Sequence, residues 1–184
     1  MSKNKFVDTL PTHKQWQWDW SKGRGGIIMP QYKTVKSYIY WDIEERVDLA
    51  SDRAKVSTLS KHLVSGQNII GNINGDDFAD VSEIAKIIKI SEKKTKEFLN
   101  RMQKARVISK STSETNEKTV WYAINPVFYN VCKYVPLPIY RLFKADIDTV
   151  IPEWMKQQYK NEMVKRGGWC GIENISSKLK NKKI

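Results

Sequence analysis

The segment from Ser91 to Lys104 carries the side chains whose chemistry is easiest to interpret. Lysine and arginine neutralise phosphate groups, while serine and asparagine hydrogen bond to phosphate oxygens and base edges. If this segment is a helix that docks in a DNA major groove, its first residues lie nearest the bases and its later residues lie on phosphates. We expect the first group to be Ser91, Lys93, Lys94 and Lys96, and the second to be Asn100, Arg101 and Lys104. The alternative is an ordinary solvated helix surface, interrupted by Glu92 and Glu97.

An apolar stripe within the same segment predicts the helix. Thr95, Phe98, Leu99 and Met102 recur at helical spacing and should face a core. Ser91 is a suitable N-cap, because its hydroxyl can accept a hydrogen bond from a backbone amide of the first turn. The basic side chains would therefore point away from the core.

A shorter helix is predicted just before this one. Val81, Ile84, Ala85 and Ile88 fall on one helical face, and Ile90 would fill the turn that follows. Two helices joined by so short a turn are typical of a helix-turn-helix.

Strand-forming runs follow the second helix. Val107 with Ile108, and residues 120–124, flank the small polar segment 111–118, which suits a hairpin tip. Lys118 is the cation of that tip and stands against Glu114 and Glu117, so we expect only a weak phosphate contact there. A helix-turn-helix followed at once by a hairpin predicts a winged helix-turn-helix.

Residues 48–64 are predicted to form the first helix of this winged unit, ended by Ser65 and Gly66. Lys55, Lys61 and His62 would face the solvent. Residues 67–77 form a turn-rich connector that could contain a small strand pairing with the wing. The buried stripe of the helix would be formed by Leu49, Ala50, Ala54, Val56, Leu59, Leu63 and Val64.

The N-terminal part is rich in tryptophan. Trp16, Trp18 and Trp20 alternate with polar residues, which predicts a strand with three indoles on one face. Residues 22–26 suggest a flexible basic loop, and residues 27–30 and 34–41 two further strands. The indoles could stack on unpaired bases. Packing against a sheet or helices is the favoured interpretation, because buried aromatic residues are far more common.

The C-terminal part is predicted to be helical. Ile139, Leu142, Phe143 and Ile147 indicate one helix, and Pro152 suits the start of another. The second helix has a wide apolar stripe that either folds back on the domain or meets a second copy of the chain. We expect a homodimer formed through Trp154, Met155, Tyr159 and Met163. Residues 169–184 would be a basic tail.

Composition points to a polyanionic partner. The chain of 184 residues has a formal net charge of +12 and a sequence pI of about 9.6. Nucleic acid is the partner that this balance favours, although charge alone does not separate DNA from RNA. Double-stranded DNA is expected because of the basic helix and the hairpin that follows it. An anionic membrane surface is the alternative, although no apolar run is long enough to cross a bilayer.

Catalytic and metal-binding patterns are not apparent in the sequence. Cys132 and Cys170 stand alone, as do His13 and His62, so we expect no metal, no cofactor and no enzyme activity. Isolated cysteines fit the reducing cytoplasm. Asp76, Asp77 and Asp80 precede a predicted helix and should favour its positive N-terminus.

Part of the chain resembles the RepL-type family of plasmid replication initiators, a winged-helix group distantly similar to MarR-type regulators. The resemblance is carried by residues 52–59, 68–70, 83–85, 90–95, 107–108 and 121–126, the last reading Trp-Tyr-Ala-Ile-Asn-Pro. It implies sequence-specific binding to a duplex origin in a plasmid or phage, with replication or transcription proteins as further partners. A transcription regulator with the same core, or a module that docks on RNA polymerase or replication enzymes, is the alternative.

The expected fold class is α+β, with a winged helix-turn-helix core, an N-terminal strand-rich extension and C-terminal helices. We predict four parts: residues 1–47 for the extension, 48–130 for the winged unit, 131–168 for the C-terminal helices and 169–184 for the tail.

Overall fold

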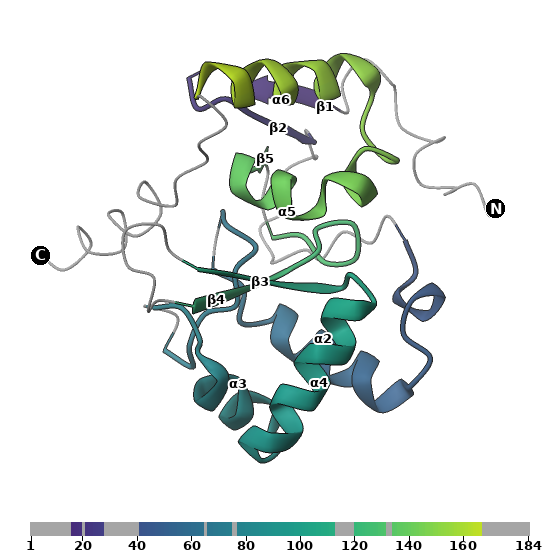
Figure 1. The fold of residues 1–184 in the computed structure, drawn as a ribbon, viewed down its shortest axis with the longest axis vertical. Coiled ribbons are helices and arrows are strands. Elements are labelled where there is room, and N and C mark those ends of the chain that lie inside the picture. Colours follow the sequence, from purple (N-terminus) through teal and green to yellow (C-terminus); the bar gives the residue numbers. More distant parts are fainter. Residues whose placement is uncertain are drawn as a thin grey trace, which may run out of the picture.

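The described part of the chain folds into two antiparallel sheets and the helices that pack on them. The computed structural model describes residues 16–19, 21–27, 41–64, 66–74, 77–112, 120–131 and 134–166. The fold class is α+β, as predicted. Figure 1 shows α2, α3 and α4 below the hairpin of β3 and β4, with α5, the second sheet and α6 above it. Of the two further strands predicted over 27–30 and 34–41, residues 28–30 and 34–40 lie outside the described residues, and so does the predicted tail.

The lower half of the molecule is a winged helix-turn-helix. Its helices are α2 (Ala50–Ser60), α3 (Val81–Ile88) and α4 (Glu92–Lys104). They pack under β3 (Ile108–Thr112) and β4 (Val120–Ile124), which pair antiparallel with Ile108 opposite Ile124. The predicted stripes of α3 and α4 are buried, apart from the half-buried Val81.

The connector adds a third segment to this hairpin, as predicted. Ile69 bridges Ala123, and the amide of Ile70 donates to the carbonyl of Tyr122 at 2.8 Å. Buried Asn68 fixes the edge, because its side-chain amide donates to the Ile124 carbonyl at 2.8 Å. The wing is therefore anchored to the segment that leads into α3.

The prediction for α2 was wrong in length and in its buried face. The helix ends at Ser60, because the chain turns so that Leu63 bridges Ile70 in an extended pair. Gly66 lies in the tight turn between them, at a φ of 78° that suits glycine. Within the helix the buried residues are Asp52, Val56 and Leu59, whereas the predicted stripe members Leu49, Ala50 and Ala54 are exposed.

The upper half combines the two ends of the chain. Strands β1 (Trp16–Asp19), β2 (Arg24–Ile27) and β5 (Tyr134–Val135) form an antiparallel sheet in the order β1-β2-β5. Helices α5 (Leu137–Ile147) and α6 (Glu153–Lys165) follow, and α6 lies along β1 and β2 in Figure 1. A short 3-10 helix, η1 (Ile43–Glu45), precedes α2.

The predicted basic loop is in fact ordered as a turn and a strand. Residues 21–23 turn the chain, and residues 24–27 form β2 because they pair with β1 on one side and β5 on the other. The tryptophan alternation correctly predicted β1. Trp18 packs edge-on against Tyr159 with ring centroids 4.8 Å apart, which supports the packing interpretation for this indole. Trp20 and the side chain of Trp16 lie outside the described residues.

The apolar stripe of α6 folds back on its own chain. Met155 and Tyr159 are each 1% exposed, and Tyr159 is stacked on Tyr140 of α5 with centroids 3.8 Å apart. These two residues therefore cannot form the predicted dimer contact, because β2 and α5 already cover them. Met163 is partly buried against the same core, and Trp154 alone of the four is exposed, at 46%.

Candidate nucleic-acid interface

The turn between α3 and α4 is short, and hydrogen bonds fix the backbone at both ends of α3. Lys89 adopts the left-handed conformation at a φ of 56°, and the amide of Ile90 donates to the carbonyl of Ala85 at 3.2 Å. Asp80 caps the start of α3 by accepting from the amide of Glu83 at 2.8 Å. That hydrogen bond is the main reason why the pKa of Asp80 lies below its ordinary value. The relative position of α3 and α4 is therefore tightly defined.

Ser91 is the N-cap of α4, as predicted. Its hydroxyl accepts from the amide of Lys94 at 3.5 Å, and its carbonyl accepts from the amide and the hydroxyl of Thr95 at 2.9 and 3.1 Å. Capping uses the acceptor side of the Ser91 hydroxyl, so its hydrogen remains able to donate outward.

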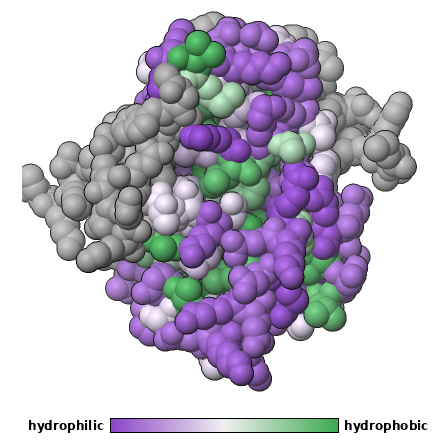
Figure 2. Space-filling model, viewed as in Figure 1, coloured by the Kyte–Doolittle hydropathy of each residue, from purple (hydrophilic) through white to green (hydrophobic). Residues whose placement is uncertain are grey.

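The basic side chains of α4 point away from the core. A helix turns by about 100° per residue, so Lys93, Glu97, Asn100 and Lys104 lie within about 30° of the direction opposite the buried stripe. Lys96 lies about 70° to one side and Lys94 about 90° to the other. All of these residues are exposed, and within the described part of the chain the four lysines form no ion pair. Figure 2 shows a largely hydrophilic surface over the lower part of the molecule, where α4 lies.

Arg101 differs from the other predicted phosphate contacts, because an acidic residue of α2 holds it. Its Nε and Nη2 atoms donate to the two carboxylate oxygens of Asp52 at 2.8 and 3.1 Å. Lys55 donates to the same carboxylate at 2.9 Å. Burial disfavours the charged form of Asp52, but these hydrogen bonds outweigh it and hold the pKa of the carboxyl below its ordinary value. The guanidinium of Arg101 thus links α4 to α2, and its predicted phosphate contact stays a prediction.

Lys55 was predicted to face the solvent but is half-buried. Besides its ion pair, its ammonium lies 5.6 Å from the ring centroid of Phe98 on α4. The sequence contained one signal for the ion pair between Lys55 and Asp52: the two residues are three positions apart in a helix and so share a face.

Two further lysines near α4 were missed by the sequence analysis. Lys89 in the turn and Lys110 on β3 are exposed, and neither forms an ion pair with another described residue. Lys86, by contrast, is paired with Glu83 at 2.6 Å. Lys118, predicted at the tip of the wing, lies outside the described residues.

A buried carboxylate ties the upper half to the base of the wing. Asp146 of α5 lies within 3.1 Å of Arg46 and 3.0 Å of Arg106, and accepts from the side-chain amide of Asn125 at 2.9 Å. Asn125 also donates to the carbonyl of Arg106 at 3.0 Å and accepts from the amide of Val127 at 3.2 Å. The end of α4, the end of β4 and α5 are therefore held in one polar cluster.

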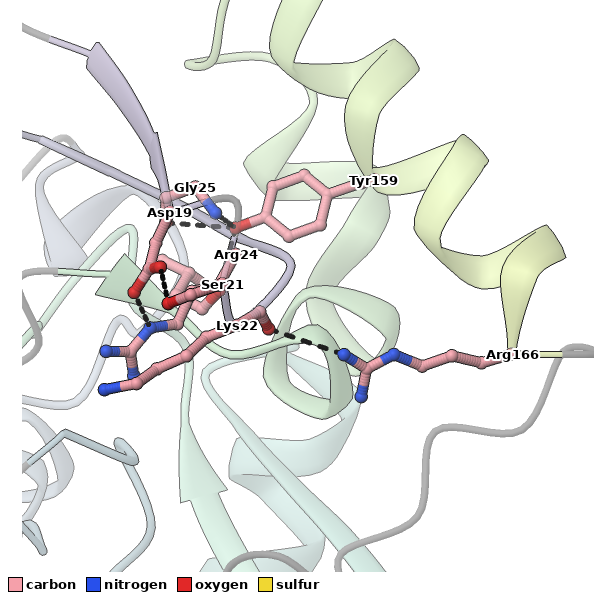
Figure 3. Close-up of polar contacts among 8 residues, drawn as sticks. Asp19, Ser21, Lys22, Arg24, Gly25, Tyr159 and Arg166 are labelled. Atoms are coloured by element: carbon pink, nitrogen blue, oxygen red, sulfur yellow. Dashed lines mark hydrogen bonds and ion pairs between the residues drawn. The ribbon is translucent and has the colours of Figure 1, made fainter.

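The basic turn of the upper sheet is internally paired, as Figure 3 shows. Asp19 accepts from the hydroxyl of Ser21 at 2.6 Å and from Nε of Arg24 at 3.2 Å, and these contacts lower the pKa of Asp19. Arg166 of α6 donates to the carbonyl of Lys22 at 3.4 Å. Lys22 has an exposed side chain, whereas the charge of Arg24 is directed to Asp19 and to the ring of Tyr134, 5.0 Å away.

Acidic, histidine and cysteine side chains do not gather into a group of three that could hold a metal ion within the described residues. The same part of the chain contains no helix long and apolar enough to span a bilayer.

Comparison with known proteins gives one structural similarity. A point mutant of S. aureus MepR bound to an oligodeoxyribonucleotide is similar to this chain with a TM-score of 0.34 and 12% sequence identity, over 68% of this chain and 82% of that one. No family model and no curated protein matches the sequence, so the resemblance to RepL-type initiators stays a prediction.

Proposed function

We propose that the chain binds double-stranded DNA with α4 as its recognition helix. The observation that carries the proposal is the outward face of α4, where exposed lysines without ion partners among the described residues stand opposite a fully buried stripe. A helix about 10–12 Å across fits a major groove about 12 Å wide. Because α4 is fixed by its cap, its turn and the Asp52 clamp, little conformational freedom would be lost on binding.

The proposed contacts follow from the positions along α4. Lys93 and Lys96 lie in the first turns and would approach base edges or the nearest phosphates, with Ser91 and Lys94 beside them. Asn100 and Lys104 would contact phosphates further along the groove. Lys89, in the turn just before α4, would extend this basic surface, while Arg101 acts indirectly by holding α4 in place.

Alanine substitution tests the proposal directly. The Lys93→Ala, Lys96→Ala double variant should bind a duplex about ten- to a hundredfold more weakly at moderate salt, because two phosphate contacts are lost. Its logarithmic salt slope should be shallower by about 0.9 for each lost contact. Fluorescence anisotropy of a labelled duplex across a salt series measures both quantities.

The matched control is Lys160→Ala. Lys160 is also an exposed helical lysine, but it lies on α6 in the upper half of the molecule. Its substitution should leave the affinity and the salt slope within about twofold of the parent protein, since it lies away from the proposed interface. Equal effects of the two variants, or no effect of the double variant, would refute the assignment of α4.

Within this function, we propose a role at a plasmid or phage replication origin, supported by the RepL-like residues 90–95 and 121–126. Such a protein acts in the cytoplasm, where that DNA lies, and a homodimer would bind a repeated or palindromic site. Selection of bound duplexes from a random pool should return two half-sites. A fragment with the recovered site should then replicate only when the protein is supplied; promoter repression without replication would instead indicate a transcription regulator.

A further inference from the structure

We infer that Glu97 is a specificity-determining residue that accepts a hydrogen bond from the exocyclic amino group of a base, foremost cytosine. This inference rests on the proposed binding of α4 in the major groove. Glu97 belongs to the second turn of α4 and lies within about 30° of the centre of the outward face. Lys93 lies one turn before it and Lys104 about two turns after it, on the same line.

The Glu97 carboxylate is exposed and forms no ion pair or hydrogen bond with another described residue. Arg101, one turn further along α4, donates its hydrogen bonds to Asp52 and is attracted to Glu97 only through space, which helps to raise the pKa of Arg101. A glutamate at this position is thus available to a ligand, whereas Glu83, Glu153 and Glu162 are each engaged with a lysine or an arginine of their own helix.

An exposed carboxylate in the centre of a face that approaches a polyanion is unfavourable unless it meets a hydrogen-bond donor. An ionised carboxylate can only accept hydrogen bonds. In the major groove the donors are the N4 amino group of cytosine and the N6 amino group of adenine, whereas guanine and thymine present acceptors at the corresponding edge. Glutamate is suited to cytosine N4, and the lysines around it would hold the flanking phosphates. Glu97 would therefore weaken binding to most sequences. Binding would be tighter where the amino group of a cytosine or an adenine lies opposite the Glu97 carboxylate.

Glu92 supplies a matched control on the same helix. It is an exposed glutamate with no ion pair to another described residue, but it lies about 110° from the centre of the outward face. Glu92→Gln and Glu97→Gln therefore make the same change in charge at different positions around α4.

The experiment uses the full chain and the duplex recovered by selection, with the base at each position varied in turn and affinity measured by anisotropy. The parent protein should prefer cytosine at one position of each half-site by about tenfold. Glu97→Ala should reduce that preference to about twofold or less while binding unrelated duplexes more tightly. Glu97→Gln should move the preference toward adenine, because an amide pairs with adenine N6 and N7. Glu92→Gln should leave the parent preference unchanged.

The inference is overturned if Glu97→Ala keeps the parent base preference, if Glu92→Gln alters it equally, or if selection returns no preferred base. In those cases a loss of affinity in the Lys93 and Lys96 variants would still support the proposed function. If those lysine variants also bind normally, both proposals fail together. Circular dichroism melting of each variant separates altered recognition from altered folding, and a Glu97 variant that melts like the parent keeps the comparison valid.

Discussion

Replacing Asp52 by asparagine tests whether α4 is held in place by ion pairs to a buried carboxylate. Asp52 is 1% exposed, and three hydrogen bonds from Arg101 and Lys55 converge on its carboxylate at 2.8 to 3.1 Å. Asparagine keeps the size of the side chain but replaces one acceptor oxygen by an amide that can only donate. That amide would face the guanidinium or the ammonium, both of which are donors too.

The expected loss of stability is about 2–3 kcal/mol. A hydrogen bond to a charged group contributes about 1.5–3 kcal/mol, and the variant loses or weakens two of the three. The side chains of Arg101 and Lys55 are 47% and 22% exposed, so water partly replaces the lost partner and lowers the cost below that of a fully buried pair. With a urea m-value of about 2 kcal/mol/M, the midpoint should fall by about 1–1.5 M.

The stability that Asp52 contributes should be lost at low pH. Because the folded-state pKa of Asp52 is lowered, the clamp contributes stability above the unfolded carboxyl pKa of about 3.9 and loses it as the pH falls through the folded value. The stability difference between the parent protein and Asp52→Asn should therefore be constant from about pH 5 to pH 7 and shrink below about pH 4.

Urea unfolding followed by tryptophan fluorescence at pH 7, 5 and 3.5 measures this difference. Asp48→Asn is the control, because Asp48 is an exposed aspartate just before α2 whose carboxylate makes no ion pair with a described residue. The free energy of unfolding of Asp48→Asn should differ from that of the parent protein by no more than about 0.5 kcal/mol. A loss below about 0.5 kcal/mol for Asp52→Asn, or a difference that persists undiminished at pH 3.5, would refute the assigned role of the clamp.

Three other substitutions have outcomes set by local geometry, each measured as a urea midpoint. Lys89→Gly should stabilise by about 0.5–1 kcal/mol, because a left-handed residue with a side chain costs more than the extra unfolded-state entropy of glycine. Gly25→Ala should destabilise by about 1–3 kcal/mol, since the added Cβ would lie 2.6 Å from Sδ of Met155, and a second change of Met155→Ala should recover part of the loss. Tyr159→Phe should cost about 1–3 kcal/mol, because the hydroxyl accepts from the Gly25 amide at 3.0 Å and donates to the Val135 carbonyl at 2.8 Å.

Local patterns predicted the helix-turn-helix and its hairpin because their signals are contained in short segments. Asp80 and Ser91 are N-caps three residues or fewer from the amides they bind, and the stripes of α3 and α4 repeat over two or three turns. Each pattern specifies an element and its inward face without reference to the rest of the chain. The outward face of α4, and hence the candidate interface, follows from the same periodicity.

The apolar spacing of one helix does not identify the residues that pack against its inward face. The stripe of α6 predicted that Met155 and Tyr159 are covered, but two of the covering residues, Trp18 and Gly25, are at least 130 positions away. The burial of Asp52 was missed for the same reason, because its partner Arg101 is on another helix, 49 residues later. A charged residue within an amphipathic pattern is normally assigned to solvent, and only the spatial pairing reverses that assignment.

The cluster around Asp146 explains why the sequence Ile-Asn-Pro at residues 124–126 matters beyond ending a strand. Asn125 is fully buried, and its amide reaches both the Arg106 carbonyl after α4 and the Asp146 carboxylate on α5. Apolar packing alone would allow α5 to slide against the hairpin, whereas these directional bonds are made in one register only. The two halves of the molecule thus share a polar cluster next to the C-terminal end of α4. A displacement of α5 would therefore strain hydrogen bonds that are made beside the C-terminal end of α4.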